Sequence, residues 1–266
     1  MAAIESNKAK IAKRVVEVLE FFDADHPQAT VMDIVRRFNR PQSSTSELLS
    51  SLVGLGLLYK DPASRSYSPT PRAALLASSV QAGMVRDGRL SALIDQLSKQ
   101  SGLGVAVFGM VGLKTQIFSW RGGKRALRTS QPDGFCGGLQ ESLTESAVGW
   151  LLLSTVPQPR RDGMVRRLNA EAPEDKKFVF GEMTAQIDLC RDQGFAQGVA
   201  GYGSLADVTA MLLPCQPEGQ PLAIGLVYEP SEFTDLAMLK QIVADGIARF
   251  SSAPYADSSV NEPMAV

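Results

Sequence analysis

Hydroxyl-bearing side chains cluster at the start of an otherwise apolar segment. The stretch QSSTSELLSSLV begins at residue 42, and residues 43–46 are all serine or threonine. These residue types are mediocre helix formers, but their hydroxyls donate and accept hydrogen bonds. At about 100° per residue, the apolar side chains lie on one side of a helix. The other side carries Ser43, Ser46, Glu47 and Ser50, with Ser44 and Ser51 at its borders.

Such an edge has the chemistry of a nucleic-acid reader. Short polar side chains let a helix lie deep in the DNA major groove, which is roughly 12 Å wide. The positive end of the helix dipole also attracts phosphate. Two alternatives remain open. Helix-turn-helix patterns also occur in protein-docking modules, and Ser44 and Glu47 have the spacing of a capping box, so Glu47 could serve its own helix.

The elements that must position this helix follow the order of a winged helix-turn-helix domain. Apolar periodicity and turn composition predict helices at 8–23, 31–38 and 41–54, then strands at 57–60 and 65–68. Thr30 is a plausible N-cap for the second helix, and DPAS is a turn between the strands. The third helix carries the hydroxyl-rich edge.

Local charge supports DNA binding although the whole chain is close to neutral. The 266 residues have a formal net charge of −1, whereas six basic and three acidic residues lie between His26 and Arg72. Arg65 and Tyr67 are expected in the second wing strand, within reach of phosphate or the minor groove. The predicted DNA contacts are Thr30, Arg36, Arg40, Gln42, Ser43, Ser44, Ser46, Glu47, Ser50, Arg65 and Tyr67.

The second half of the chain has a different character. VAVFGM and TQIFSW alternate around VGLK, and DVTAMLLP and LAIGLVYE flank CQPEGQP, so two antiparallel hairpins are predicted. Helices are expected after the capping-box pair Ser142 and Glu145, at 158–171, at 182–193, and in the closing segment that ends at Phe250. This mixture predicts an α+β sensor domain. The expected divisions are 1–71, a linker helix at 72–84, 85–250, and a disordered tail at 251–266.

Few residues indicate catalysis or a bound metal. His26 is the only histidine, and no nucleophile elbow or paired metal-ligand spacing accompanies it. The three cysteines lie far apart, which argues against a disulfide framework and favours a reducing cytoplasm. We expect no cofactor, no metal and no membrane span, and an enzyme is the third of three hypotheses.

The chain resembles the IclR-type family of bacterial transcriptional regulators. In the first half, the matching segments are VLEFF, VMDIVRRF, PQSSTSELLSSLVGLGLLYKDP and RSYSPTPRAALL. In the second half, LTESAVGWLLLSTVP, LCRDQGF and LLPCQPEGQPLAIGLVYEP resemble the family's GAF-like effector domain. The resemblance covers about residues 8–250. The family often has basic residues where Gln42 and Glu47 stand, so no base preference is carried over.

The resemblance implies a homodimer or dimer of dimers that binds a palindromic operator and responds to a small molecule, often an organic acid or aromatic catabolite. The expected pocket lies among the sheet, helix 145–156 and the loop after Trp120. Its predicted lining is Phe108, Phe118, Trp120, Arg121, Arg128, Cys136, Ser146 and Met211, with the two arginines as partners for a carboxylate. The alternative is that these aromatic residues and Met211 are ordinary core and the arginines solvated surface. The rival function is a small-molecule sensor whose helical N-terminal domain docks on a protein.

Overall fold

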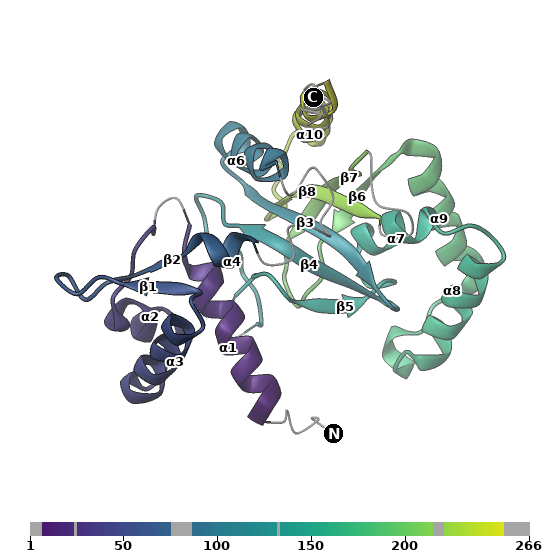
Figure 1. The fold of residues 1–266 in the computed structure, drawn as a ribbon. Helices are drawn as coiled ribbons and strands as arrows, with labels where there is room; N and C mark the ends of the chain where they lie inside the picture. Colours follow the sequence, from purple (N-terminus) through teal and green to yellow (C-terminus); the bar gives the residue numbers. More distant parts are fainter. Residues whose placement is uncertain (1–6, 24–25, 76–86, 132–133, 215–220, 253–266) are drawn as a thin grey trace, which may run out of the picture. The chain divides into compact units, whose positions relative to one another are not determined.

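The computed structural model describes residues 7–23, 26–75, 87–131, 134–214 and 221–252 (Figure 1). The chain divides into two units, Met1–Gln81 and Ala82–Val266. The N-terminal unit has a single apolar cluster, and the C-terminal unit has one on each face of its sheet.

The described residues of the N-terminal unit form four helices and a two-stranded sheet. In chain order they are α1 (Asn7–Phe21), α2 (Val31–Phe38), α3 (Gln42–Gly54), β1 (Leu58–Lys60) and β2 (Tyr67–Pro69), followed by α4 (Pro71–Leu75). Its core contains Val18, Ile34, Leu49, Leu52, Leu58 and Tyr67, each at most 2% exposed. Burying one such side chain contributes about 1.5–3 kcal/mol. Packing therefore holds the serine-rich α3 in place despite its modest helix propensity.

A capping box fixes the start of α2. The backbone N–H of Asp33 donates to Thr30 Oγ1 at 3.4 Å, and the backbone N–H of Thr30 donates to Asp33 Oδ2 at 2.8 Å. Hydrogen bonds from the Thr30 backbone and hydroxyl lower the pKa of Asp33 below its usual value. The helix ends at Asn39, whose φ of 48° is left-handed. The chain then turns sharply into α3, and Thr30 is confirmed as an N-cap.

Six antiparallel strands form the sheet of the C-terminal unit, in the order β5-β4-β3-β8-β7-β6. The strands are β3 (Gly104–Val111), β4 (Lys114–Arg121), β5 (Gln140–Ser142), β6 (Phe195–Val199), β7 (Asp207–Leu212) and β8 (Leu222–Tyr228). A bulge between Val107 and Phe108 interrupts the β3–β4 register. Because β3 and β8 lie in the middle of the sheet, most of their side chains are buried.

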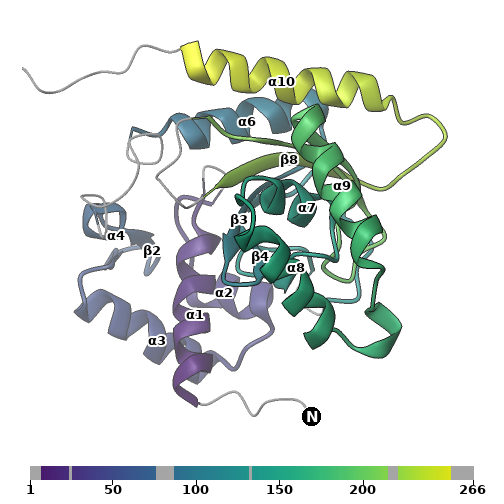
Figure 2. The ribbon, with the colours of Figure 1, turned by 90° about the vertical axis from the view of Figure 1, so that its right-hand side faces the viewer.

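Helices cover both faces of this sheet. The helices α6 (Arg89–Ser101) and α10 (Leu236–Ser252) lie side by side on one face (Figures 1 and 2), where Leu97 and Val243 pack with Val107. The other face carries α7 (Ala147–Ser154), α8 (Arg160–Glu171) and α9 (Phe180–Gln193), with a 3-10 turn at Glu174–Lys176. There Leu151 and Ile187 pack with Phe108. The α+β architecture with an N-terminal winged helix-turn-helix is therefore confirmed.

The structure also corrects the expected elements. The helix α6 and the edge strands β5 and β6 were not predicted. The predicted capping box of Ser142 and Glu145 is wrong, because Ser146 is the N-cap of α7 and accepts from the backbone N–H of Gly149 at 3.3 Å. Residues 76–84 of the predicted linker helix, and 253–266 of the predicted tail, lie outside the described residues.

In the five described ranges, no helix has both the length and the apolar character needed to cross a bilayer. Over the same ranges, no three histidine, cysteine, aspartate or glutamate side chains gather in a way that could hold a metal ion.

Candidate DNA-binding surface and effector site

One edge of α3 is polar and open to solvent. Thr45, Leu49 and Leu52 are buried in the N-terminal core. The exposed side chains of the helix are those of Gln42, Ser43, Glu47, Ser50 and Ser51. Ser44 and Ser46, also predicted DNA contacts, are half-buried. The exposed edge is the part of α3 that a partner can reach.

Most hydroxyls on α3 are already used by the helix itself. The Oγ of Ser50 donates to the carbonyl of Ser46 at 2.8 Å, and Ser51 Oγ donates to the carbonyl of Glu47 at 3.0 Å. These bonds use the hydroxyl hydrogen and leave the oxygen able to accept. By contrast, the side chains of Gln42 and Ser43 make no hydrogen bond within the described part of the chain. They keep their full capacity to read a base edge.

Two arginines connect the start of α3 to α1. Arg14 Nη2 donates to Ser44 Oγ at 3.0 Å, and Ser44 Oγ in turn donates to the carbonyl of Pro41 at 3.2 Å. Arg40 Nη2 donates to both carboxylate oxygens of Glu17 at 3.3 Å. Ser44 and Arg40 therefore hold the unit together, whatever else they contact. The capping alternative for Glu47 is not seen, since Pro41 is the N-cap and has no side-chain cap.

The wing is a short hairpin with a rigid polar turn. The strands β1 and β2 pair antiparallel, with Lys60 opposite Tyr67. Asp61 Oδ2 accepts from Ser64 Oγ at 2.7 Å, and Asp61 Oδ1 accepts from the backbone N–H of Ala63 at 2.9 Å. Hydrogen bonds from Ser64 and Ala63 lower the pKa of Asp61. Arg65 is exposed in this turn with a left-handed φ of 57°, rather than in the strand as predicted.

Tyr67 lies in the core and not on the wing surface. Its side chain is 1% exposed and packs with Leu58 and Ile34, while its backbone pairs with Ala29. The Lys60 ammonium lies 5.4 Å from the ring centroid. A residue buried to this degree offers no side-chain surface to DNA, contrary to the expectation from sequence. The alternation of the strand places the tyrosine inward.

The exposed positive charges of the N-terminal unit come from several elements. Arg36 and Arg37 occupy the last turn of α2, Lys60 ends β1, and Arg72 lies in α4; all four are exposed, as is Arg65 in the wing turn. Thr30 is exposed too, but its hydroxyl and backbone N–H are used by the capping box. These cations supply the electrostatic part of any contact with phosphates.

The predicted effector residues divide between the two faces of the sheet. Phe108, Trp120 and Ser146 lie on the face covered by α7, α8 and α9. Met211 packs on the opposite face with the residues under α6 and α10. Phe118 is 46% exposed, and its ring lies against Gly109. The predicted set therefore does not form one site. Cys136 is half-buried beside Phe135 in the chain.

Both predicted carboxylate-binding arginines already pair with carboxylates of the chain. Arg121 Nη2 donates to Asp95 Oδ1 of α6 at 2.6 Å. Arg128 donates to Glu229 Oε1 through its backbone N–H at 2.8 Å and through Nε at 3.0 Å, and these two bonds lower the pKa of Glu229. Neither arginine points into the apolar core that contains Phe108. The alternative view of them as surface residues agrees better with these contacts.

A half-buried carboxylate with one fully buried oxygen lies where no sequence pattern marked one. Glu141, on β5, accepts a short hydrogen bond from the backbone N–H of Tyr202. Burial raises the pKa of Glu141 to about 7, although the Tyr202 N–H acts in the opposite direction, as does the nearby Ser146 hydroxyl, which makes no hydrogen bond to Glu141 Oε1. Beside it the Tyr202 ring stacks on Phe108, with centroids 6.3 Å apart, and meets Phe135 edge-on at 5.5 Å. The sequence around Glu141 is polar and resembles a loop, so the sequence analysis did not single out this residue.

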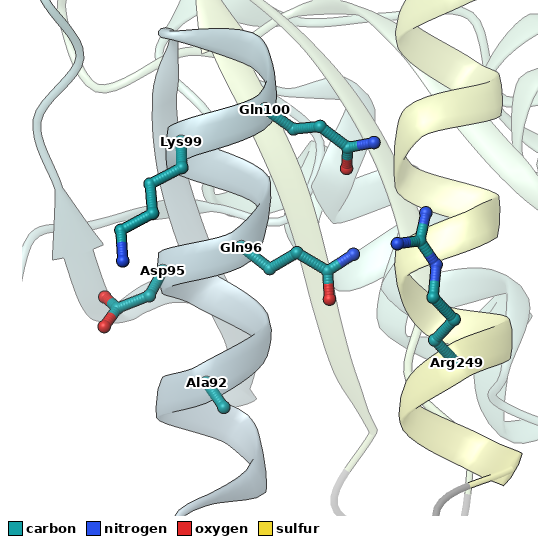
Figure 3. Close-up of a pocket in the computed structure, with 6 residues that line it drawn as sticks. All are labelled: Ala92, Asp95, Gln96, Lys99, Gln100 and Arg249. Carbon is teal, nitrogen blue, oxygen red and sulfur yellow. The ribbon is translucent and has the colours of Figure 1, made fainter.

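A surface hollow lies elsewhere, between α6 and α10. It is lined by Ala92, Asp95, Gln96, Lys99, Gln100 and Arg249. In Figure 3, Gln96 and Gln100 point toward Arg249, whereas Asp95 and Lys99 project from another side of α6. None of the predicted effector residues lines this hollow, and all of its lining residues except Ala92 are polar residues of two outer helices.

Comparison with known proteins identifies the N-terminal domain. Residues 12–62 match the model of the IclR helix-turn-helix domain, the span from α1 to the start of the wing turn. A search of curated protein sequences found no significant match.

Several solved structures share the fold of the chain. An IclR transcriptional regulator from Alicyclobacillus acidocaldarius is 16% identical, with a TM-score of 0.53, over 91% of this chain and 95% of that one. An IclR homologue from Microbacterium hydrocarbonoxydans, complexed with 4-hydroxybenzoate, is 16% identical, with a TM-score of 0.52, over 91% of this chain and all of that one. The effector domain of an IclR regulator from Acinetobacter sp. ADP1 is 23% identical, with a TM-score of 0.51, over 68% of this chain and 99% of that one.

At these identities the likeness establishes the fold, and the helix-turn-helix match adds the type of N-terminal domain. Residues 12–62 are therefore an IclR-type helix-turn-helix domain, and the chain shares the fold of the solved IclR-type regulators.

Proposed function

We propose that this protein binds double-stranded operator DNA through α3 and the wing, under the control of a small molecule bound in its C-terminal unit. The exposed pair Gln42 and Ser43 carries the proposal. Both lie in the first turn of α3, where the helix dipole is positive, and neither side chain is used within the described residues. A glutamine pairs well with adenine in the major groove, and a serine can pair with several bases.

The wing supplies the complementary phosphate contact. Arg65 is exposed on a turn that the Asp61 hydrogen bonds make rigid, so its backbone loses little freedom on binding. Such a contact fixes the position of the protein on DNA without reading sequence. Arg36 and Ser46 remain in the proposed contact set, whereas the buried Tyr67 does not belong to it.

The proposed operator is palindromic, because two copies of the chain related by a two-fold axis would bind two equivalent half-sites. A two-fold pair places its recognition helices about 34–36 Å apart, one turn of DNA. A homodimer, or a dimer of dimers, is therefore part of the proposal, as is a cytoplasmic location.

A small aromatic compound or organic acid is the proposed effector. The aromatic side chains around Phe108 favour the aromatic class, and the Microbacterium homologue was crystallised with 4-hydroxybenzoate. An effector that changes operator affinity must itself bind with an affinity that DNA changes by the same factor, typically corresponding to 1–3 kcal/mol.

Docking of the N-terminal unit on another protein remains the second candidate. The exposed apolar side chains of Ile11 and Val16 on α1, at 56% and 52% exposure, are the feature that favours it. They also fit contact with a second copy of the chain. The polar edge of α3 distinguishes the candidates, because a protein-docking helix normally presents apolar anchors.

A salt titration tests the proposal. The full chain is titrated against labelled DNA from upstream of its own gene at several salt concentrations. Operator binding should weaken steeply, with a logarithmic slope of about −0.9 per phosphate neutralised. Affinity that is absent, or the same for every salt concentration, would contradict DNA binding and leave the protein-docking candidate.

A further inference from the structure

Three buried polar atoms without partners gather on one side of the sheet. Thr115 Oγ1, Glu141 Oε1 and Tyr202 Oη have no hydrogen-bond partner among the described residues. Thr115 and Glu141 are directly opposite each other in the β4–β5 ladder, so their side chains leave the same face. Tyr202 is anchored to the same carboxylate, because its backbone N–H donates to Glu141 Oε2, and burial together with the charge of Glu141 raises the pKa of its hydroxyl. Buried polar atoms are normally paired, and three orphans in one place need an explanation.

Aromatic rings border these atoms. Tyr202 is 3% exposed, and its ring stacks on Phe108. Phe135 meets Tyr202 edge-on, and the centroids of Phe135 and Trp120 are 4.6 Å apart. We call Thr115, Glu141 and Tyr202, together with the rings of Phe108, Trp120 and Phe135, the Glu141 cluster. The cluster combines several aromatic side chains with a small number of unpaired polar atoms, which is the composition of a small-molecule site.

The loop that carries Tyr202 is built for this arrangement. Gly201, Tyr202 and Gly203 all have left-handed φ angles, of 84°, 55° and 65°. A Cβ at Gly201 would collide with the Glu141 carboxylate, so only glycine lets the loop approach so closely. A tyrosine rarely adopts a positive φ, and such conformations concentrate at functional sites. The loop holds the tyrosine against the carboxylate at a conformational cost.

The charges near the cluster define what it can accept. Glu145 and Lys176 also face Glu141, but they pair with each other through a bond of 2.6 Å from Lys176 Nζ to Glu145 Oε2. Neither predicted arginine faces it. A carboxylate ligand would therefore meet a second carboxylate and no free cation from these groups. A hydroxyl or ammonium group would instead give Glu141 Oε1 the donor that it lacks.

We propose that the Glu141 cluster is the effector site and that its effector is a small aromatic compound whose hydroxyl or ammonium group donates to Glu141. This rests on the proposed function and selects one class within it, in place of simple organic acids. Tyr202 Oη and Thr115 Oγ1 would bind a second polar group of the same ligand. The aromatic rings would stack on its ring, as aromatic faces do on planar and cationic groups.

Calorimetric titration of the full chain with three matched probes tests this. The probes are 4-methylphenol, 4-methylbenzylamine and 4-methylbenzoate, which share a ring and differ in the polar head. At pH 8, where Glu141 is ionised, the phenol and the amine should each bind at least about tenfold more tightly than the benzoate, because a ligand donor pairs with the carboxylate. Their affinity should fall as the pH drops to 6 and Glu141 takes up a proton.

Variants distinguish ligand binding at the Glu141 cluster from changes in affinity caused by removing a charge elsewhere in the unit. Glu141→Gln keeps an oxygen that can accept from Tyr202, removes a buried charge, and should lower the affinity for the two donor probes about tenfold. Tyr202→Phe should weaken them less. The matched control Glu174→Gln changes a side chain that is 89% exposed on the same side of the unit, and should leave all three affinities unchanged.

Two results would overturn the inference. One is tight binding of 4-methylbenzoate that Glu141→Gln preserves or improves, and the other is no binding by any of the three probes. DNA affinity, measured on the same preparation, is independent of both results. If the probe titrations contradict the inference and operator binding is intact, the proposed regulator has a different effector. If operator binding is absent, the proposed function itself is contradicted.

Discussion

Arg14 Nη2 donates to Ser44 Oγ at 3.0 Å, and this bond connects α1 to the first turn of α3. The two residues are thirty positions apart in the chain. Since Gln42 and Ser43 precede Ser44 directly, the bond also anchors the turn of α3 that carries the proposed base-reading side chains.

Arg14→Ala should weaken operator binding by about three- to tenfold, because a hydrogen bond to a charged group contributes about 1.5–3 kcal/mol and part of that loss appears as misplacement of α3. Ser44→Ala is the matched control, since it removes the same bond and keeps the arginine. Equal losses in a fluorescence anisotropy titration would assign Arg14 a positioning role. An Arg14→Ala variant with unchanged affinity would show that the bond does not position the reader.

The burial of Tyr67 leads to a prediction that separates folding from DNA contact. Tyr67→Phe should leave operator affinity unchanged, because the hydroxyl of a buried tyrosine does not reach DNA. Tyr67→Ala should destabilise the N-terminal unit by about 3–5 kcal/mol through the cavity it leaves. Chemical denaturation and the anisotropy titration measure the two effects. A marked loss of affinity in a fully folded Tyr67→Phe protein would restore the tyrosine to the DNA-contacting set.

Gly201→Ala tests the close approach of the Tyr202 loop to Glu141. The new methyl group combines a left-handed φ with a collision against a buried carboxylate, so the expected cost is about 2–4 kcal/mol. Gly194→Ala is the matched control, because Gly194 has a φ of 72° but open space around its Cβ position. It should cost only the backbone strain, about 1–2 kcal/mol. Equal melting temperatures for the two variants would contradict the close packing at Gly201.

The raised pKa of Glu141 gives stability a definite dependence on pH. The pKa is about 7 in the folded chain and near 4.3 when unfolded. Between these values the folded state binds more protons, so this group's contribution to stability is lost as the pH rises from about 4 to 7. Relative to wild type, Glu141→Gln should therefore gain about 2–3 kcal/mol of stability between pH 5 and pH 8. A stability difference that does not vary with pH would show that Glu141 has an ordinary pKa.

Local signals predicted much of the N-terminal unit. Thr30, predicted as an N-cap, marked the start of α2, and the apolar periodicity of α3 identified Leu49 and Leu52 as core. Each signal involves residues within a few positions, where helical geometry decides which side chains meet. Arg65 was expected in a strand because turn composition alone did not show where the hairpin turn ends.

The Glu141 cluster was not predictable in this way. Glu141 and Tyr202 lie 61 positions apart, and β5 and β6 occupy opposite edges of the sheet, so neither sequence spacing nor strand topology predicts that the Tyr202 loop reaches Glu141. The same topology separates Met211 from Phe108, although both lie in apolar strands. Periodicity shows which side chains share one face of a strand, but it does not show which face of the sheet that is. The glycines on either side of Tyr202 were the one local sign of an unusual loop.

The most direct test of the account is the base preference of α3 variants. Affinities for a set of operator sequences, each changed at one position, are measured for the wild type, Gln42→Ala and Arg65→Ala at fixed salt. Gln42→Ala should change the preference at particular positions and keep its thermal stability. Arg65→Ala should weaken all sequences alike and reduce the salt slope by about one. A Gln42→Ala protein with wild-type preference at every position, together with an Arg65→Ala protein of unchanged affinity, would contradict the claim that this edge and this wing contact DNA.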